Sequence, residues 1–179
     1  MTTALLIIDV QHVLCTGEYA VFEIGRVLEK INAVSAQARA AGAPVILIQH
    51  EEEGGPLAFD TEGWQLAEGL EVSPEDLRVR KTTPDAFHQT TLSGLLKEKG
   101  ITQLVVCGMQ SDFCVDSTVR RALTLGYDVT LVADAHSTIA NEVLSAAQIT
   151  AHHNVTLGHM TSAAARIEVI PAAAVRIKH

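Results

Sequence analysis

The chain has 179 residues, of which 47% are hydrophobic, 19% are charged and only 4% are aromatic. This length and composition predict one folded domain, residues 1–179, with a core built mainly from aliphatic side chains, and they exclude a disordered chain. A formal net charge of −8 disfavours nucleic acid as a partner, because the phosphate backbone binds basic surfaces.

Neither a membrane partner nor a secretion signal is expected from the sequence. No apolar run reaches the roughly 20 residues that a membrane-spanning helix needs. The apolar N-terminal run has no basic residues before it and is interrupted by Asp9, which is typical of a strand rather than of a signal peptide. The three cysteines are odd in number and form no Cys-x-x-Cys pair, so we expect a cytoplasmic protein without a disulfide framework.

Short apolar runs alternate with segments of helical periodicity along the chain. Strands are predicted at residues 4–8, 45–48, 77–79, 104–107, 127–133 and 167–170. Helices are predicted from residue 24 to the glycine at 42, at 92–99, from 111 or 112 to 125, at 141–152 and, as a shorter piece, at 161–165. Residues 51–74 fit neither pattern, and a loop of this length in a small domain usually has a function. Strands that alternate with helices in this way predict an α/β fold with a parallel sheet.

Polar or reactive positions follow four of the predicted strands. Asp9 ends the first strand and His50 the second. Lys81 follows the third strand, and the segment from Gly108 to Cys114 follows the fourth. Ligands of parallel α/β sheets bind outside the carboxyl ends of the strands, so these positions are predicted to converge on one edge.

Cys114 is the strongest candidate for a catalytic residue. It falls in the first turn of a predicted helix opened by Ser111 or Asp112, where the helix dipole and free amides favour the thiolate. A thiolate in such a place is a nucleophile. The alternative is a small buried side chain without a chemical role, which is common for unpaired cysteine.

Asp9 and Lys81 are candidates for its partners. A carboxylate at the end of a strand would accept the thiol proton and return it to a leaving amine, although Asp9 is equally suited to a turn or a helix cap. Lys81 would keep Asp9 ionised, favour the thiolate and stabilise negative charge as it develops. The alternative for Lys81 is a surface lysine beside Arg80.

Taken together, the chain resembles the isochorismatase-like superfamily of cysteine hydrolases, which includes nicotinamidases and N-carbamoylsarcosine amidohydrolase. The matching motifs, in family order, are Leu6–Gln11, Arg80–Lys81, Ala86–Phe87, Thr91–Leu92, Val105–Val115, Thr118, Ala122, Gly126 and Val132–Ala135. Each motif is weak alone, but the ordered set covers nearly the whole chain and is specific.

The resemblance implies a three-layer α-β-α sandwich with a six-stranded, mainly parallel, Rossmann-like sheet. It implies a catalytic triad of Asp9, Lys81 and Cys114, and a cis peptide bond between Met109 and Gln110. The backbone amides of Gln110 and Cys114 would form an oxyanion hole. The implied reaction is hydrolysis of a small amide, ureido or similar C–N bond through a thioester on Cys114, without a cofactor.

Two departures from the family pattern concern the substrate. Isochorismatases proper lack the nucleophilic cysteine, so Cys114 argues against that activity. Nicotinamidases carry an Asp-x-His metal motif after the second strand, whereas this chain has Ile48 in place of the aspartate and only His50 of the motif. No second histidine occurs before His88. We therefore expect no bound metal and a main substrate other than nicotinamide.

Four further residues are assigned to the substrate pocket, each with an alternative where the sequence suggests one. His50 would contact the substrate or cap its strand. Trp64 would cover the pocket or anchor the long loop. Phe87 would form a pocket wall or pack in the core. Gln11 belongs to the motif that follows the first strand.

Two other functions remain open at this stage. One is a thiol-redox protein in which Cys114 reacts and Cys15 or Cys107 resolves the product. The other is a catalytically silent binding domain on the same fold. In each case the expected partner is a small molecule, and the family resemblance implies a homodimer or homotetramer.

Overall fold

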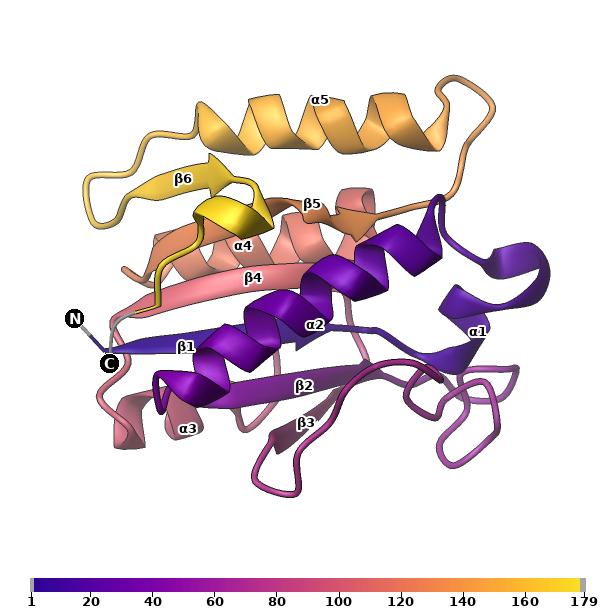
Figure 1. Ribbon diagram of the computed structural model, residues 1–179, viewed down its shortest axis with the longest axis horizontal. Coiled ribbons are helices and arrows are strands. Elements are labelled where there is room, and N and C mark those ends of the chain that lie inside the picture. Colours follow the sequence, from indigo (N-terminus) through magenta and orange to yellow (C-terminus); the bar gives the residue numbers. More distant parts are fainter. Residues whose placement is uncertain (1, 178–179) are drawn as a thin grey trace.

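The computed structural model describes residues 2–177 and contains one sheet of six parallel strands (Figure 1). The strands are β1 (Thr3–Ile8), β2 (Val45–His50), β3 (Leu77–Lys81), β4 (Gln103–Met109), β5 (Asp128–Ser137) and β6 (Ile167–Ile170). Their order across the sheet is β3-β2-β1-β4-β5-β6, and every neighbouring pair is parallel. The predicted α/β class and parallel sheet are confirmed.

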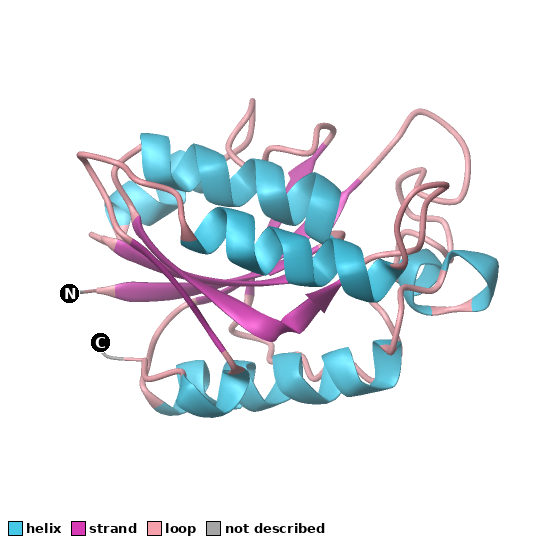
Figure 2. Ribbon diagram, turned by 90° about the horizontal axis from the view of Figure 1, so that it is seen from above, coloured by secondary structure: helices cyan, strands magenta, loops and turns pink. Residues whose placement is uncertain are grey.

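Helices cover both faces of the sheet, which makes the three layers visible in Figure 2. The α-helices are α1 (His12–Cys15), α2 (Ile24–Ala40), α3 (Leu92–Glu98), α4 (Asp116–Thr124) and α5 (Ala146–Gly158). Short turns of other helix types are η1 (Gly17–Tyr19), the π-helical turn η2 (Ser111–Val115) and η3 (Ala172–Ala174). One core lies between the sheet and α2 with η3, and the other between the sheet and α3, α4 and α5.

The central strand β1 shows why the sheet is buried on both sides. Leu6 and Ile8 point into the core under α3, α4 and α5, whereas Leu5 and Ile7 point into the core under α2. Successive side chains of a strand face opposite sides, so a strand covered on both faces must be apolar at every position. Burial of the strands on both faces therefore explains the continuous apolar runs from which the strands were predicted.

Three predicted helices differ from the structure. The helix expected from residue 111 or 112 is divided into the π-helical turn η2 and the helix α4. The helix after β5 begins at Ala146 rather than at Asn141, because the side chain of Asn141 accepts the amides of Val143 and Leu144 and forms a turn. Ser145 then starts the helix with a capping box. Residues 161–165 form no helix, and the Ser162 hydroxyl accepts an amide in a local turn there.

No helix of residues 2–177 combines the length and the apolar character needed to cross a membrane.

The strand order reverses between β1 and β4, and this reversal fixes the location of the site. The chain runs from β1 outward through β2 to β3, then returns across the sheet to β4 and runs outward again. Connections diverge from this point, so a crevice opens outside the carboxyl ends of β1 and β4. Asp9 follows β1 at this crevice, and Cys114 follows β4.

Candidate active site

Asp9 occupies a left-handed turn directly after β1. Its φ is 50°, a conformation that aspartate tolerates better than most residues. The Asp9 amide donates to the Ile48 carbonyl at 2.9 Å, and the Gln11 amide donates to the Asp9 carbonyl at 2.9 Å. The side chain is buried, and its Oδ1 has no hydrogen-bond partner among residues 2–177. The turn therefore holds an acceptor oxygen in a water-poor position at the crevice.

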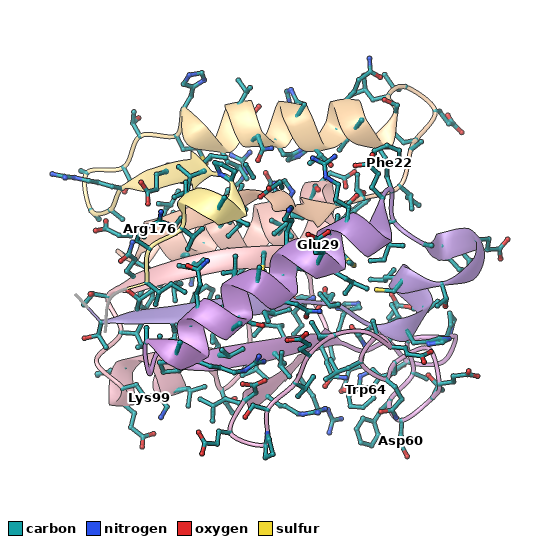
Figure 3. All side chains as sticks on the ribbon, in the orientation of Figure 1. Phe22, Glu29, Asp60, Trp64, Lys99 and Arg176 are labelled. Carbon is teal, nitrogen blue, oxygen red and sulfur yellow. The ribbon has the colours of Figure 1, made fainter. Side chains whose placement is uncertain are left out.

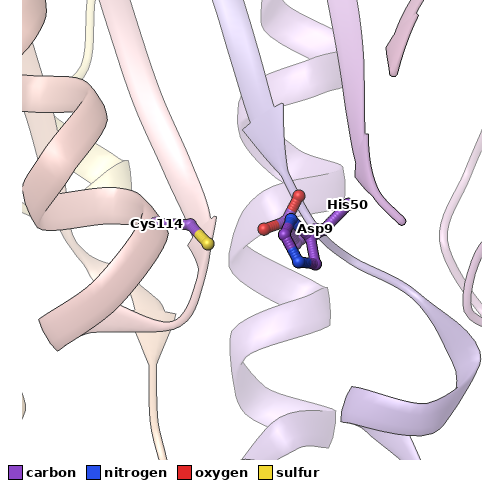
Figure 4. Close-up of side chains that lie close together, drawn as sticks. All are labelled: Asp9, His50 and Cys114. Carbon is purple, nitrogen blue, oxygen red and sulfur yellow. The ribbon is translucent and has the colours of Figure 1, made fainter. Parts of the chain in front are cut away.

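Lys81, the last residue of β3, joins the candidate residues into one cluster. Its fully buried Nζ lies 2.7 Å from Asp9 Oδ2, 3.2 Å from Cys114 Sγ and 3.2 Å from His50 Nδ1. An ammonium has three N–H donors and no acceptor, so these three contacts use all of them. Asp9, His50 and Cys114 face one another in the crevice (Figure 4). The structure thus brings together all three residues of the predicted triad.

His50 takes part in this cluster in its neutral form. Its Nδ1 must accept from the Lys81 ammonium, which requires the tautomer that carries its proton on Nε2. Burial, followed by the charge of Lys81, lowers the pKa of His50 and favours this uncharged form. The Nε2 atom then faces Glu52 Oε1 at 3.5 Å. The contact of His50 with Lys81 could not be predicted from the sequence, because the two residues are neighbours only across β2 and β3.

Cys114 lies in the π-helical turn η2 between β4 and α4. Burial and, after it, the charge of Asp9 raise the pKa of the Cys114 thiol to about 12, although Lys81 acts in the opposite direction. The thiolate that we expected at this position is therefore not favoured by its surroundings. Ser111 and Asp112 also form no cap: the Ser111 hydroxyl contacts His136, and Asp112 accepts from Thr138.

The segment before Cys114 has the peptide geometry that the resemblance implied. The peptide bond between Met109 and Gln110 is cis. The Gln110 carbonyl accepts the amides of Phe113 and Val115, each at 3.1 Å, and these bonds fix the turn that carries the thiol. Gln110 and Cys114 both line the cavity described next.

Asp9, His50 and Cys114 also have the donor types of a metal site, with their ligand atoms within 4.8 Å of one another. Each of these residues, however, already accepts a hydrogen bond from Lys81 Nζ. A divalent cation among the three would lie against a buried ammonium, which Coulomb repulsion strongly disfavours. These residues do not fit a metal ion, and the cation of the cluster is Lys81.

A cavity of about 410 Å³ opens at this cluster. Its lining residues are Asp9, Leu14, His50, Glu52, Leu57, Thr82, Pro84, Gln110, Phe113 and Cys114. Thr82 and Phe113 were not predicted as site residues. Each is next to a predicted site residue in the sequence, Lys81 or Cys114, and this proximity could have indicated them. No such proximity indicates the other lining residues Leu14, Glu52 and Leu57. The fold of the chain outside the sheet brings them to the cavity, and the sequence pattern does not predict it.

Three of the four residues predicted for the substrate pocket do not line this cavity. The Gln11 side-chain amide donates to the carbonyls of His50 and Trp64 and accepts from the His50 amide, so it ties the long loop to β2. Trp64 is buried with its ring edge against Phe59. Phe87 stacks on Tyr127 in the core. Only His50 of this set faces the cavity.

Comparisons with known proteins agree with this architecture. The isochorismatase domain model matches residues 3–165. A crystal structure of an isochorismatase family protein superposes with a TM-score of 0.84 and 37% identity, covering 93% of this chain and 97% of that one.

Two curated relatives are enzymes by name. Streptothricin hydrolase of Streptomyces noursei is 45% identical over 138 residues, which are 75% of this chain and 49% of that protein. The chain therefore spans about half the length of the streptothricin hydrolases that it matches. Ureidoacrylate amidohydrolase RutB of Pseudomonas savastanoi pv. phaseolicola is 31% identical over 170 residues, 74% of this chain and 69% of that protein. The chain belongs to the isochorismatase family of hydrolases.

Proposed function

We propose that this protein hydrolyses an amide, ureido or similar C–N bond of a small molecule through a thioester on Cys114. The observation that carries the proposal is the position of Lys81 Nζ, 2.7 Å from the Asp9 carboxylate and 3.2 Å from Cys114 Sγ. One buried cation thus contacts both a base and a nucleophile beside a cavity. The names of the two enzyme relatives support hydrolysis of this kind.

In the first half of the reaction, Asp9 acts as a general base. The raised pKa of Cys114 means that the resting enzyme holds a thiol, so the proton leaves as Sγ attacks the substrate carbonyl carbon. The S–C bond forms, and the carbonyl π electrons move to oxygen. The backbone amides of Gln110 and Cys114 would stabilise this oxyanion. The tetrahedral intermediate then collapses, the C–N bond breaks, and protonated Asp9 gives its proton to the departing nitrogen.

In the second half, the Asp9 carboxylate takes a proton from water as the water oxygen attacks the thioester. Collapse of the second tetrahedral intermediate breaks the S–C bond and releases a carboxylic acid. Asp9 returns its proton to the Cys114 sulfur, which restores the starting state. Lys81 stabilises the negative charge as it moves between carboxylate and sulfur, and neutral His50 holds the Lys81 ammonium in position.

The alternative of a thiol-redox protein has less support. Redox-active cysteines have lowered pKa values, because the thiolate is the reactive form. Burial raises the pKa of Cys15 and of Cys114 to about 12, and it also raises that of Cys107. These thiols are therefore poorly suited to exchange, whereas the Asp9–Lys81 pair is explained by hydrolysis.

The test is release of ammonia or amine from a panel of small amides and ureides. We expect the wild type to cleave at least one class and Cys114→Ala to lose at least about 10³-fold in kcat/KM, since it lacks the nucleophile. Cys15→Ala, a matched change of another partly buried cysteine, should keep most of the activity. Equal activity of the wild type and Cys114→Ala would refute the proposal, and loss of activity in Cys15→Ala alone would assign the reacting thiol to Cys15 instead.

A further inference from the structure

The segment between β2 and β3 carries most of the net charge of the chain. Residues 51–76 hold nine of the 21 acidic residues and no lysine, arginine or histidine. Outside this segment, acidic and basic residues nearly balance. Figure 3 labels Asp60 and Trp64 on this loop, which lies beside the carboxyl ends of the strands. The negative charge of the protein is thus concentrated next to the cavity, to which the segment contributes Glu52 and Leu57.

Some of these carboxylates have cationic partners, but in the part of the chain that the structure describes Glu52 has none. Glu51 pairs with Arg80 at 2.7 Å, and Asp76 pairs with Arg39 at the same distance. Among residues 2–177, the Glu52 carboxylate pairs only with the uncharged imidazole of His50, at 3.5 Å, and 56% of the Glu52 side chain is exposed. No cation of residues 2–177 neutralises its negative charge, and its side chain is more than half exposed at a residue that lines the cavity.

The cavity itself lacks a cation that would balance this charge. None of its described lining residues is a lysine or an arginine. Lys81 is fully buried behind the lining, and its charge is matched by that of Asp9. The remaining wall is largely apolar, from Leu14, Leu57, Pro84 and Phe113. A ligand in this cavity meets an unbalanced carboxylate, a largely apolar wall and the Cys114 thiol.

From this arrangement we infer that the substrate is a cationic amide, whose ammonium or guanidinium group binds Glu52 while its carbonyl lies at Cys114. The inference rests on the proposed function and names the substrate class of the same site. A charge-assisted hydrogen bond to Glu52 would be about twice as strong as a neutral one. The acidic segment would also draw cations toward the opening and repel anions. An apolar linker between the two groups would pack against Leu57 and Phe113.

The experiment compares three amides of matched length: 5-aminopentanamide, hexanamide and the monoamide of adipic acid. They end in an ammonium, a methyl group and a carboxylate, respectively. We expect the wild type to prefer the ammonium amide over hexanamide by at least about tenfold in kcat/KM, mainly through KM, and to cleave the carboxylate amide least. Higher salt should reduce the preference.

Glu52→Gln should lower the ratio of ammonium amide to hexanamide by about tenfold. The glutamine keeps an acceptor for His50, so the cluster around Lys81 is preserved. Glu53→Gln removes the same charge at the next residue, which does not line the cavity, and should leave the ratio within about twofold of the wild type. Preference for hexanamide or the carboxylate amide, or an unchanged ratio in Glu52→Gln, would overturn the inference.

A binding measurement tests the inferred charge preference independently of the proposed hydrolysis. If the wild type cleaves none of the three amides, the hydrolase proposal fails for this class. Calorimetric titration of Cys114→Ala with the same compounds then still tests the charge preference. Tighter binding of 5-aminopentanamide, reduced in the double variant with Glu52→Gln, would support the cationic ligand. Equal binding of all three compounds would refute it.

Discussion

The Cys114 thiol lies beside two opposite charges: the Asp9 carboxylate raises its pKa, as burial does, and the Lys81 ammonium lowers it. The positions of Asp9, Lys81 and Cys114 could be predicted from the sequence, because each follows a strand whose carboxyl end lies at the same sheet edge. The pKa direction of Cys114 could not, since it is set by desolvation and by a carboxylate 105 positions earlier in the chain. The contacts of Lys81 with Asp9, His50 and Cys114 could not be predicted either, because they depend on the register between β2 and β3.

Asp9→Asn provides a test at this scale. The change removes the charge that raises the pKa of Cys114 but leaves Lys81 beside Sγ, so the thiol pKa should fall. Alkylation of Cys114 by iodoacetamide at pH 7.5 should therefore be faster in Asp9→Asn than in the wild type. Amide hydrolysis should fall by about 10²–10⁴-fold, because the general base is lost.

The control for this experiment is the same pair of proteins with Cys114→Ala, which reports alkylation at Cys15 and Cys107. Slower or unchanged alkylation of Cys114 in Asp9→Asn would contradict the assignment of Asp9 as the nearby negative charge. Full retention of hydrolysis would contradict its role as base.

At the scale of elements, a buried histidine links three segments next to the turn that carries Cys114. His136 of β5 receives a hydrogen bond from the Ser111 hydroxyl of η2 at 2.8 Å and donates from Nε2 to Asn154 of α5 at 2.8 Å. Asn154 in turn donates to the Ala133 carbonyl. Burial lowers the pKa of His136 to about 4, so the ring is neutral in the folded protein. This network holds the Cys114 turn against the end of β5.

His136 predicts how stability depends on pH. Its folded pKa lies below the unfolded value, so the unfolded state binds a proton first as the pH falls. The contribution of neutral His136 to the free energy of unfolding is fully present above about pH 6.5 and is lost as the pH falls toward about 4. When the pH falls from 7 to 4.5, the free energy of unfolding, measured with urea, should decrease by about 2 kcal/mol more in the wild type than in His136→Gln. The glutamine keeps a donor for Asn154 but does not titrate.

His88→Gln, which removes an exposed histidine, is the matched control and should retain the wild-type pH dependence. An equal loss of stability in His136→Gln and the wild type would contradict the neutral buried state of His136.

The elements themselves show which features a sequence pattern can predict. All six strands were predicted because burial on two faces demands continuous apolar runs. The start of α5 was misplaced because Asn141 uses its side chain in a turn, a local competition that periodicity does not reveal. Gln11 and Trp64 do not line the cavity, and of the two alternatives for Trp64 the anchor of the long loop agrees with its contacts. Their contacts depend on the path of residues 51–74, which has no periodicity to read.

At the scale of the molecule, strand order and charge distribution together define the site. The reversal between β1 and β4 creates the crevice, and the acidic segment after β2 borders it. The parallel sheet follows from general rules for alternating strands and helices, but the shape of the cavity follows from loop paths and could not be predicted. The cytoplasmic location and the homodimer or homotetramer stay predictions.

The central claim is a covalent thioester on Cys114, and mass spectrometry of the quenched reaction tests it most directly. An amide that the wild type cleaves is mixed with enzyme and quenched in acid during turnover. We expect intact protein to gain the mass of the acyl group, with the modification on the peptide that contains Cys114 and none in Cys114→Ala. Steady hydrolysis without any adduct on Cys114, together with undiminished activity of Cys114→Ala, would contradict the account.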